Sequence, residues 1–134
     1  MLVLEGVDAG YGNAQVLRGL SLTAKAGEVT CVMGRNGAGK TTLLRAVMGQ
    51  VRLSAGRISL DGQRIDCLPA HQVPRLGIGY VPQGRRLFGP LTVAENLEIG
   101  LRARGGGGAV RARVLDLFPR LRERLGQVSA TLSG

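Results

Sequence analysis

Aromatic residues are scarce in this sequence: they make up 3% of its 134 residues, and there is no tryptophan. Leu, Val, Ile and Ala must therefore fill the core that an apolar content of 44% allows. No apolar run approaches the ~20 residues that a helix needs to cross a bilayer. The first ten residues lack a basic region followed by an apolar run, so we expect no signal peptide and a cytosolic protein.

Cysteine and histidine are also rare. Cys31 and Cys67 lie far apart, and together with His71 they are too few for a four-ligand Cys/His metal motif. Cys31 lies in an apolar segment, so we expect it to be a small core residue. We expect His71 to lie at the surface, and we assign a functional role to none of the three.

Acidic residues number nine against 18 basic ones, which gives a formal net charge of +9. Such a balance is found in nucleic-acid-binding proteins. Here, however, the arginines are spread from Arg18 to Arg124, and almost no aromatic residues lie between them to stack on bases. We therefore expect no nucleic-acid partner, and we favour a basic face near acidic lipid headgroups or phosphate ligands.

Apolar periodicity predicts an alternation of strands and helices. The expected strands are Leu2–Val7, Val16–Thr23, Val29–Met33, a hairpin over Ile58–Ile65, and Gly77–Pro82. The expected helices are Lys40–Gly49, a short one in Pro69–Leu76, Thr92–Leu101, and Ala109–Leu125. A buried strand that feeds a helix indicates an α/β core, and the all-helical tail indicates a small separate subdomain.

Local signals sharpen this assignment. Asp61–Gly62 between two alternating runs predicts a tight hairpin turn. Thr92 with Glu95 three positions later is a capping-box pattern. Pro119 is expected to divide the last helical segment in two, and the four glycines at 105–108 are expected to form a flexible surface connection.

One segment carries a specific chemistry. Gly34-Arg35-Asn36-Gly37-Ala38-Gly39-Lys40-Thr41 matches the pattern G-x-x-x-x-G-K-[ST] at every fixed position. The glycines let the loop curl so that backbone N–H groups face phosphate oxygens, and the following helix adds a positive end. Lys40 can reach the β- and γ-phosphates, and the Thr41 hydroxyl can coordinate Mg²⁺. The expected strand before the loop and helix after it favour a nucleoside triphosphate site over a plain glycine-rich turn.

From this loop outward the chain resembles the ATP-binding subunits of ABC transporters. Tyr11-Gly12-Asn13-Ala14-Gln15-Val16-Leu17 is similar to the family's A-loop, Tyr80-Val81-Pro82-Gln83 to its Q-loop, and Leu132-Ser133-Gly134 to the start of its signature motif. The resemblance runs along essentially the whole chain. By residue alone, Tyr11 is equally compatible with an ordinary turn tyrosine. Gln83 has the alternative of a polar loop residue, but its place after a short expected strand and before the helical part favours the functional interpretation.

The resemblance implies an ATPase with ATP and Mg²⁺ as its ligands. Tyr11 would stack on adenine, Gln83 would reach Mg²⁺ and the attacking water, and Ser133 would contact the γ-phosphate held by a second subunit. Lys40 and Gln83 are the implied catalytic residues, and Thr41 and Gln83 the implied Mg²⁺ ligands. The implied nucleotide-binding residues are Tyr11, Val16, Gly34, Arg35, Asn36, Gly37, Ala38, Gly39, Lys40, Thr41, Thr42 and Ser133.

Several stretches resemble importer subunits for branched-chain amino acids and for urea. They are Arg35–Thr42, Gly77–Arg86, Leu91–Leu97 and Leu117–Leu121. Gly34-Arg35-Asn36 and Gln83-Gly84-Arg85-Arg86 look more like the urea branch. The implied partners are transmembrane permease subunits, a second ATP-binding subunit and, indirectly, a periplasmic or extracellular solute-binding protein. The implied location is the cytoplasmic face of the cell membrane, as a peripheral subunit.

The expected fold class is therefore α/β: the N-terminal portion of a P-loop NTPase of the ABC type. It would combine an antiparallel β subdomain, an incomplete parallel core and the start of a helical subdomain. We expect a nucleotide-binding core and β subdomain in residues 1–90 and a helical subdomain in 91–134.

The family's Asp for Mg²⁺, catalytic Glu and switch His have no counterpart here, so the chain looks truncated at the signature. On its own we expect it to be marginally stable and to have little ATPase activity. Two alternatives stay open: a soluble ABC-type ATPase acting on nucleic acid or ribosomes, and a fragment without function.

Overall fold

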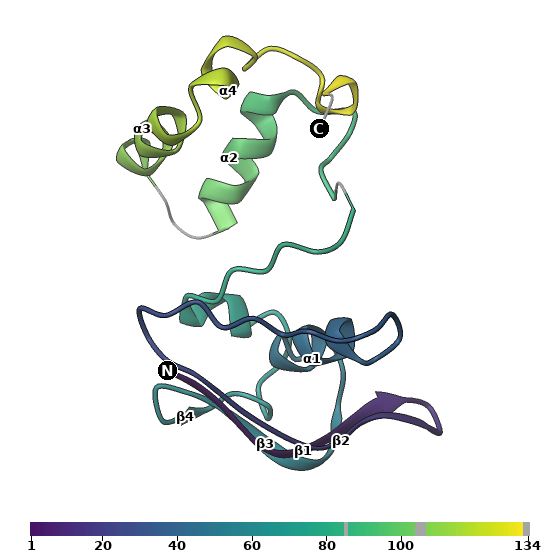
Figure 1. Cartoon of the computed structure of the whole chain (residues 1–134). Helices are drawn as coiled ribbons and strands as arrows, with labels where there is room; N and C mark the ends of the chain where they lie inside the picture. Colours follow the sequence, from purple (N-terminus) through teal and green to yellow (C-terminus); the bar gives the residue numbers. More distant parts are fainter. Residues whose placement is uncertain (85, 104–106, 133–134) are drawn as a thin grey trace. The chain divides into compact units, whose positions relative to one another are not determined.

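The computed structural model describes residues 1–84, 86–103 and 107–132. Two compact units divide the chain, Met1–Tyr80 and Val81–Gly134, and each is described by itself. In the described residues no helix has both the length and the apolar character that crossing a membrane requires. Figure 1 shows the sheet and α1 in the first unit, and the helices α2, α3 and α4 in the second.

The first unit is built on a four-stranded antiparallel sheet with the order β2-β1-β3-β4. Its strands are β1 (Leu2–Tyr11), β2 (Ala14–Ala24), β3 (Leu53–Leu60) and β4 (Gln63–Arg64). The predicted turn at Asp61–Gly62 is confirmed, because it joins β3 to β4 and both residues have positive φ, 48° and 82°. Asp61 tolerates this left-handed backbone better than most residues, and glycine adopts it without steric cost.

Helix α1 (Lys40–Val47) covers one face of this sheet (Figure 1). It turns Leu43, Ala46 and Val47 inward, where they meet the core residues Leu4 and Val7 of β1, which a bulge between them brings to the same face. The helix stops before Gly49, as the sequence predicts, and Gly49 has a φ of 67°. A short 3₁₀ helix, η1 (Val73–Leu76), with Pro74 near its start, closes this part of the chain and buries Val73.

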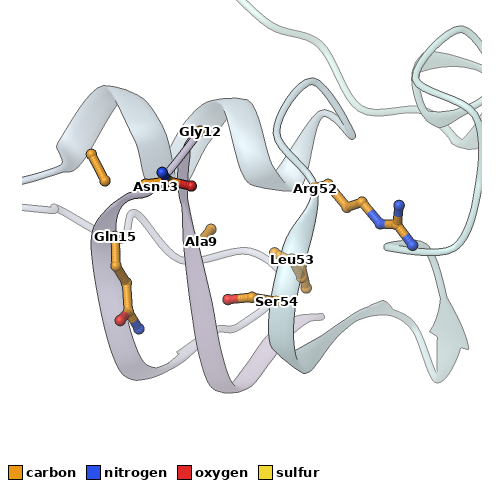
Figure 2. Close-up of a pocket in the computed structure, with 9 residues that line it drawn as sticks. Ala9, Gly12, Asn13, Gln15, Arg52, Leu53 and Ser54 are labelled. Atoms are coloured by element: carbon orange, nitrogen blue, oxygen red, sulfur yellow. The ribbon is translucent and has the colours of Figure 1, made fainter.

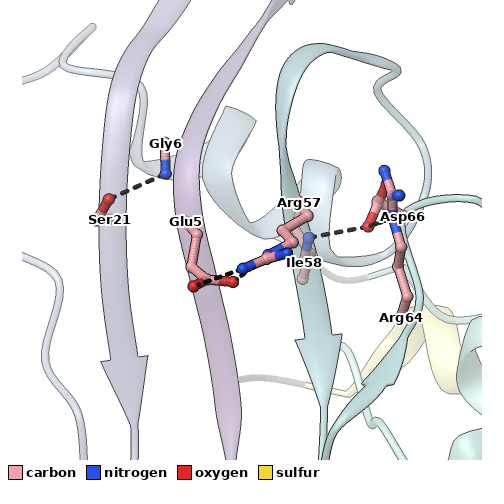
Figure 3. Close-up of polar contacts among 7 residues, drawn as sticks. All are labelled: Glu5, Gly6, Ser21, Arg57, Ile58, Arg64 and Asp66. Carbon is pink, nitrogen blue, oxygen red and sulfur yellow. Dashed lines mark hydrogen bonds and ion pairs between the residues drawn. The ribbon is translucent and has the colours of Figure 1, made fainter.

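Polar contacts tie the strands together across the sheet (Figure 3). Glu5 of β1 and Arg57 of β3 stand opposite each other and form an exposed ion pair. The carboxylate of Asp66, whose side chain is 7% exposed, accepts hydrogen bonds from the Ile58 amide (2.9 Å) and from the Arg64 guanidinium. These contacts fix the end of β3 against the segment that follows the hairpin.

Two strand predictions are wrong. In the described residues neither Val29–Met33 nor Gly77–Pro82 forms a strand, and Val29 is 99% exposed. A strand exists through its hydrogen bonds to a neighbour, and the four strands of the sheet pair only with one another. For the same reason Cys31 is exposed and is not the core residue that its apolar surroundings predict.

The second unit is helical. It contains α2 (Val93–Ala103), α3 (Gly108–Leu117), α4 (Pro119–Glu123) and the 3₁₀ turn η2 (Ser129–Thr131). The predicted division at Pro119 is confirmed, because α3 ends two residues before it and α4 begins on it. The glycine run was predicted as a connection throughout, but Gly108 already belongs to α3; Gly105 and Gly106 lie outside the described residues.

The predicted capping box of α2 is confirmed in full. The Thr92 amide donates to the Glu95 carboxylate (2.8 Å), and the Glu95 amide donates to the Thr92 hydroxyl (3.2 Å). The two residues thereby satisfy N–H groups that the first turn of a helix leaves without partners. These hydrogen bonds also lower the pKa of Glu95 below its ordinary value.

Candidate nucleotide-binding site

The predicted phosphate loop occupies residues 34–39 and leads directly into α1. Gly37 and Gly39 have φ values of 83° and 90°, in the left-handed region that side chains rarely adopt. Gly39 is also crowded: a Cβ there would lie 3.1 Å from Val16 Cγ1 and 3.0 Å from Leu17 Cδ2. The loop therefore needs glycine at this position both for backbone conformation and for its close packing against β2.

Lys40 places a positive charge inside this loop. Its Nζ donates to the carbonyl oxygens of Gly34 (2.6 Å) and Arg35 (2.8 Å). The ammonium group therefore lies beside the first residues of the loop, although Lys40 itself follows the last one. Because Lys40 is flexible and carries three donors, it can exchange carbonyl oxygens for phosphate oxygens without a change in the backbone.

The start of α1 adds to the positive character. Gly39 at its N-cap offers no side-chain acceptor, and the first turn contains no acidic residue. The N–H groups of a first helical turn have no partners within the helix, and the helix dipole favours an anion there. Loop, lysine and helix start together form a site for a phosphate chain.

The two threonines of the motif lie in different environments. Thr41 is exposed, so its hydroxyl is accessible to a ligand, whereas Thr42 is 6% exposed. Leu43, next along the helix, is buried in the core. The helix that carries Lys40 and Thr41 is thus anchored by the residues that follow them.

Tyr11 ends β1 and keeps 44% of its surface exposed. Its hydroxyl accepts a hydrogen bond from Arg45 Nη1 at 3.3 Å. Hydrogen bonding to Thr42 and then to Arg45 lowers the pKa of Tyr11 below its usual range. The structure therefore brings the predicted adenine-stacking ring to the helix of the phosphate loop.

Gln83 and Ser133 are not brought to this site by the described contacts. Gln83 is exposed and belongs to the second unit, which is described separately from the phosphate loop. Ser133 and Gly134 lie outside the described residues. Their contributions to a nucleotide site stay predictions.

A cleft of about 550 Å³ borders the β1–β2 turn (Figure 2). Its walls are the turn residues after Ala9 and the first residues of β3, with Arg52 beside them. None of the described residues that line it comes from the phosphate loop. We therefore do not assign this cleft to the nucleotide, despite its size.

The second unit contains an apolar groove of about 310 Å³. It is lined by the segment that follows Gln83, by one side of α2, and by residues near η2. These lining residues are Arg86, Leu87, Phe88, Val93, Asn96, Leu97, Ile99, Gly100, Leu121, Ser129 and Leu132. Leu87 and Phe88 are more than half exposed, so the groove presents apolar side chains to a potential partner.

Two polar residues that the sequence analysis did not single out make central contacts. Arg45 bonds Tyr11, and Asn96 bonds both the Phe88–Thr92 segment and Ser129. Both lie on amphipathic helices, where a polar residue is normally solvated. Asn96 follows the cap residue Glu95 directly and lies in the family-like stretch Leu91–Leu97, and these two placements were the local signals available.

The family model described as ABC transporter matches residues 17–134. Among curated relatives, the high-affinity branched-chain amino acid transport ATP-binding protein BraG of Pseudomonas aeruginosa is 40% identical over all of this chain. The probable branched-chain amino acid transport ATP-binding protein LivF of Archaeoglobus fulgidus is 37% identical over the same extent. The chain spans 58% of the length of each of these two relatives.

A third relative is described as acting in export. The lipopolysaccharide export system ATP-binding protein LptB of Haemophilus influenzae is 41% identical over 78% of this chain and 43% of its own length. Among solved structures, an ATP-binding subunit of an ABC transporter aligns with a TM-score of 0.85 and 29% identity, over 98% of this chain and 55% of its own. An ATP-binding cassette in its ADP conformation aligns with a TM-score of 0.81 and 25% identity, over 99% and 59%.

Proposed function

This chain belongs to the ABC transporter family, and from that premise we propose that it is the ATP-binding part of a subunit whose ATP binding and hydrolysis drive solute import. The observation that carries the proposal is the loop at the start of α1, where Lys40 Nζ lies against the Gly34 and Arg35 carbonyls. A curled glycine loop, an internal ammonium group and an uncapped helix start are together suited to a triphosphate.

The residues proposed to hold ATP fit it by their chemistry. Gly34, Arg35, Asn36, Gly37, Ala38 and Gly39 supply the backbone of the cradle, followed by Lys40, Thr41 and Thr42. Lys40 neutralises the phosphates, and the exposed Thr41 hydroxyl is the proposed ligand for Mg²⁺. Val16 packs at Gly39, and Tyr11 offers a partly exposed ring for adenine. Bound ATP supplies a phosphoanhydride whose hydrolysis releases free energy.

We propose that Gln83 also reaches the Mg²⁺ and water region and that Ser133 completes the site of a second ATP-binding subunit. These two roles rest on the resemblance of Tyr80-Val81-Pro82-Gln83 and Leu132-Ser133-Gly134 to family motifs. The apolar groove beside Leu87 and Phe88 supports the related proposal that this side of the second unit docks a transmembrane permease subunit. The proposed location is accordingly the cytoplasmic face of the membrane.

For the solute we propose a branched-chain amino acid, with urea or a related amide as the alternative. Both relatives that match over the whole chain are described as branched-chain amino acid transport proteins. Relatives described as acting in lipopolysaccharide export and in iron or hemin import are also similar, at 35% to 42% identity.

Calorimetric titration of the purified chain with MgATP tests the central claim. Lys40→Ala removes charge-assisted hydrogen bonds of about 1.5–3 kcal/mol, so affinity should fall about 10- to 100-fold. Lys25→Ala is the matched control, because Lys25 is the only other lysine and lies exposed after β2. Equal MgATP affinity in the wild type and Lys40→Ala would refute the proposed site.

A further inference from the structure

Arg45 connects two parts of the first unit that lie far apart in the sequence. It occupies the second turn of α1, and Tyr11 lies at the end of β1. Arg45 Nη1 donates a hydrogen bond to the Tyr11 hydroxyl at a distance of 3.3 Å. Arg45 is half-buried, whereas Tyr11 is 44% exposed. The contact therefore holds the polar end of an aromatic side chain that still has a substantial part of its surface exposed to solvent.

Other side chains reinforce this anchor. Thr42, one turn before Arg45 on the same helix, also hydrogen-bonds the Tyr11 hydroxyl, and together they lower the pKa of Tyr11. The Tyr11 hydroxyl raises the pKa of Arg45, and Tyr80 adds a smaller contribution of the same sign. The Arg45 contact therefore fixes Tyr11 to α1 and not to its own strand alone.

The anchor matters because α1 also carries the phosphate-binding residues. Lys40 and Thr41 form the first turn of the helix, and Arg45 projects from the next turn. An exposed tyrosine that is free to rotate must lose side-chain freedom when a base stacks on it, at a cost of about 0.5–1.5 kcal/mol. A ring already held by the helix avoids that cost and keeps one orientation relative to the phosphate loop.

We propose that Arg45 is a positioning residue for the base of bound ATP: it holds the Tyr11 ring in stacking orientation from the helix that binds the phosphates. This inference rests on the proposed function, because it takes Tyr11 as the stacking residue. It assigns Arg45 to the base and ribose end of the nucleotide, and it leaves the phosphate chain to Lys40 and the loop.

The test compares a ligand that has a base with one that has none. The whole 134-residue chain is titrated with MgATP and with inorganic tripolyphosphate, as the wild type, Arg45→Ala, Tyr11→Phe and the double variant. Arg45→Ala should weaken MgATP binding about 2- to 10-fold and leave tripolyphosphate binding unchanged. The double variant should bind MgATP no more weakly than Tyr11→Phe, since the loss of the Tyr11 hydroxyl already removes the Arg45 contact together with the Thr42 contact.

Two further variants separate positioning from charge and from folding. Arg52→Ala removes an exposed arginine shortly after α1, so it controls for the lost positive charge and should leave both affinities unchanged. Tyr11→Phe keeps the ring and removes only the hydroxyl, so it tests the same contact if Arg45→Ala does not fold. A loss of MgATP affinity in Tyr11→Phe with tripolyphosphate binding intact supports the inference.

The experiment distinguishes failure of the proposed function from failure of this inference. If the wild type binds neither ligand, the proposed function itself is wrong. If the wild type binds both but Arg45→Ala weakens them equally, Arg45 serves the phosphates or the fold, and the inference is overturned. If Arg45→Ala and Tyr11→Phe change neither affinity, the contact does not position the base, and the inference is likewise overturned.

Discussion

Asn96 is the hydrogen-bonding centre of the second unit, and its replacement by alanine should destabilise that unit strongly. Its Oδ1 accepts from the Phe88 amide at 3.0 Å. Its Nδ2 lies 2.9 Å from the Ser129 hydroxyl, 3.0 Å from the Thr92 carbonyl and 3.1 Å from the Phe88 carbonyl. One side chain thereby joins the segment after Gln83, the start of α2 and η2.

The magnitude follows from the capacity of the amide group. An asparagine side chain has two N–H hydrogens, so at most two of the short Nδ2 contacts are full hydrogen bonds, and Oδ1 adds a third. Each contributes about 1 kcal/mol net. Ser129 is 5% exposed and would lose a partner where water reaches poorly, whereas the Phe88 contacts are exposed. We expect Asn96→Ala to cost about 2–3 kcal/mol.

Urea unfolding followed by the helical circular dichroism signal measures this cost. With a slope of about 1 kcal/mol per molar urea, the midpoint of the helical unit should fall by about 2–3 M. Glu98→Ala is the control on the same helix, because its exposed ion pair with Arg102 should contribute at most about 0.5 kcal/mol. Hydrogen exchange adds a local readout: the Phe88 amide should lose protection, and the Glu95 amide, capped by Thr92, should keep it. A cost of Asn96→Ala no larger than that of Glu98→Ala would refute the reasoning.

Three further changes have definite expected outcomes. Gly39→Ala and Gly37→Ala both strain a left-handed backbone, by about 1–2 kcal/mol, but only Gly39 is crowded by Val16 and Leu17. In thermal unfolding, the midpoint temperature of Gly39→Ala should therefore be lower than that of Gly37→Ala. Equal midpoints would contradict this. Thr92→Ala removes the cap of α2 and should lower the free energy of unfolding in urea by about 1 kcal/mol. An unchanged midpoint would mean that the cap does not stabilise the helix. Burial raises the pKa of Asp66, but hydrogen bonds from Arg64 and the Ile58 amide outweigh it and leave this pKa below its ordinary value. Its stabilisation is present above about pH 4 and is lost as the pH falls through the lowered pKa, so acid titration should destabilise the wild type more steeply than Asp66→Asn, and parallel curves would count against the assignment.

Short-range patterns in the sequence predicted local structure well. The Asp61–Gly62 turn, the Thr92–Glu95 capping box and the break at Pro119 all appear as expected. Each depends on residues only a few positions apart, whose backbone preferences and hydrogen bonds decide the outcome without tertiary help. The start of α1 directly after the glycines at 34–39 belongs to the same class, whereas the strand expected before them, Val29–Met33, does not form in the described residues.

The strands predicted at Val29–Met33 and Gly77–Pro82 failed for the opposite reason. Apolar β-branched runs raise strand propensity, but a strand forms only where another strand supplies hydrogen bonds. In the described residues the sheet consists of β1 to β4 paired with one another, and neither segment is one of its strands. Val29 and Met33 are accordingly exposed in the described structure, although apolar side chains such as theirs are usually buried.

Arg45 and Asn96 were missed because their importance lies in contacts that span eight to 34 positions. Along a helix both read as ordinary polar residues of a solvated face, and only the folded chain brings Tyr11 or Ser129 to them. In both cases the partner is close to a motif that the sequence analysis identified. Tyr11, the partner of Arg45, belongs to the A-loop-like stretch, and Ser129, the partner of Asn96, lies just before Leu132. Motif residues thus define the chemistry offered to a ligand, while polar residues inside neighbouring helices determine how those motif residues are held. Arg45→Ala keeps every motif residue, so it should retain the Lys40 charge and lose the anchoring of the Tyr11 ring that we propose for base binding.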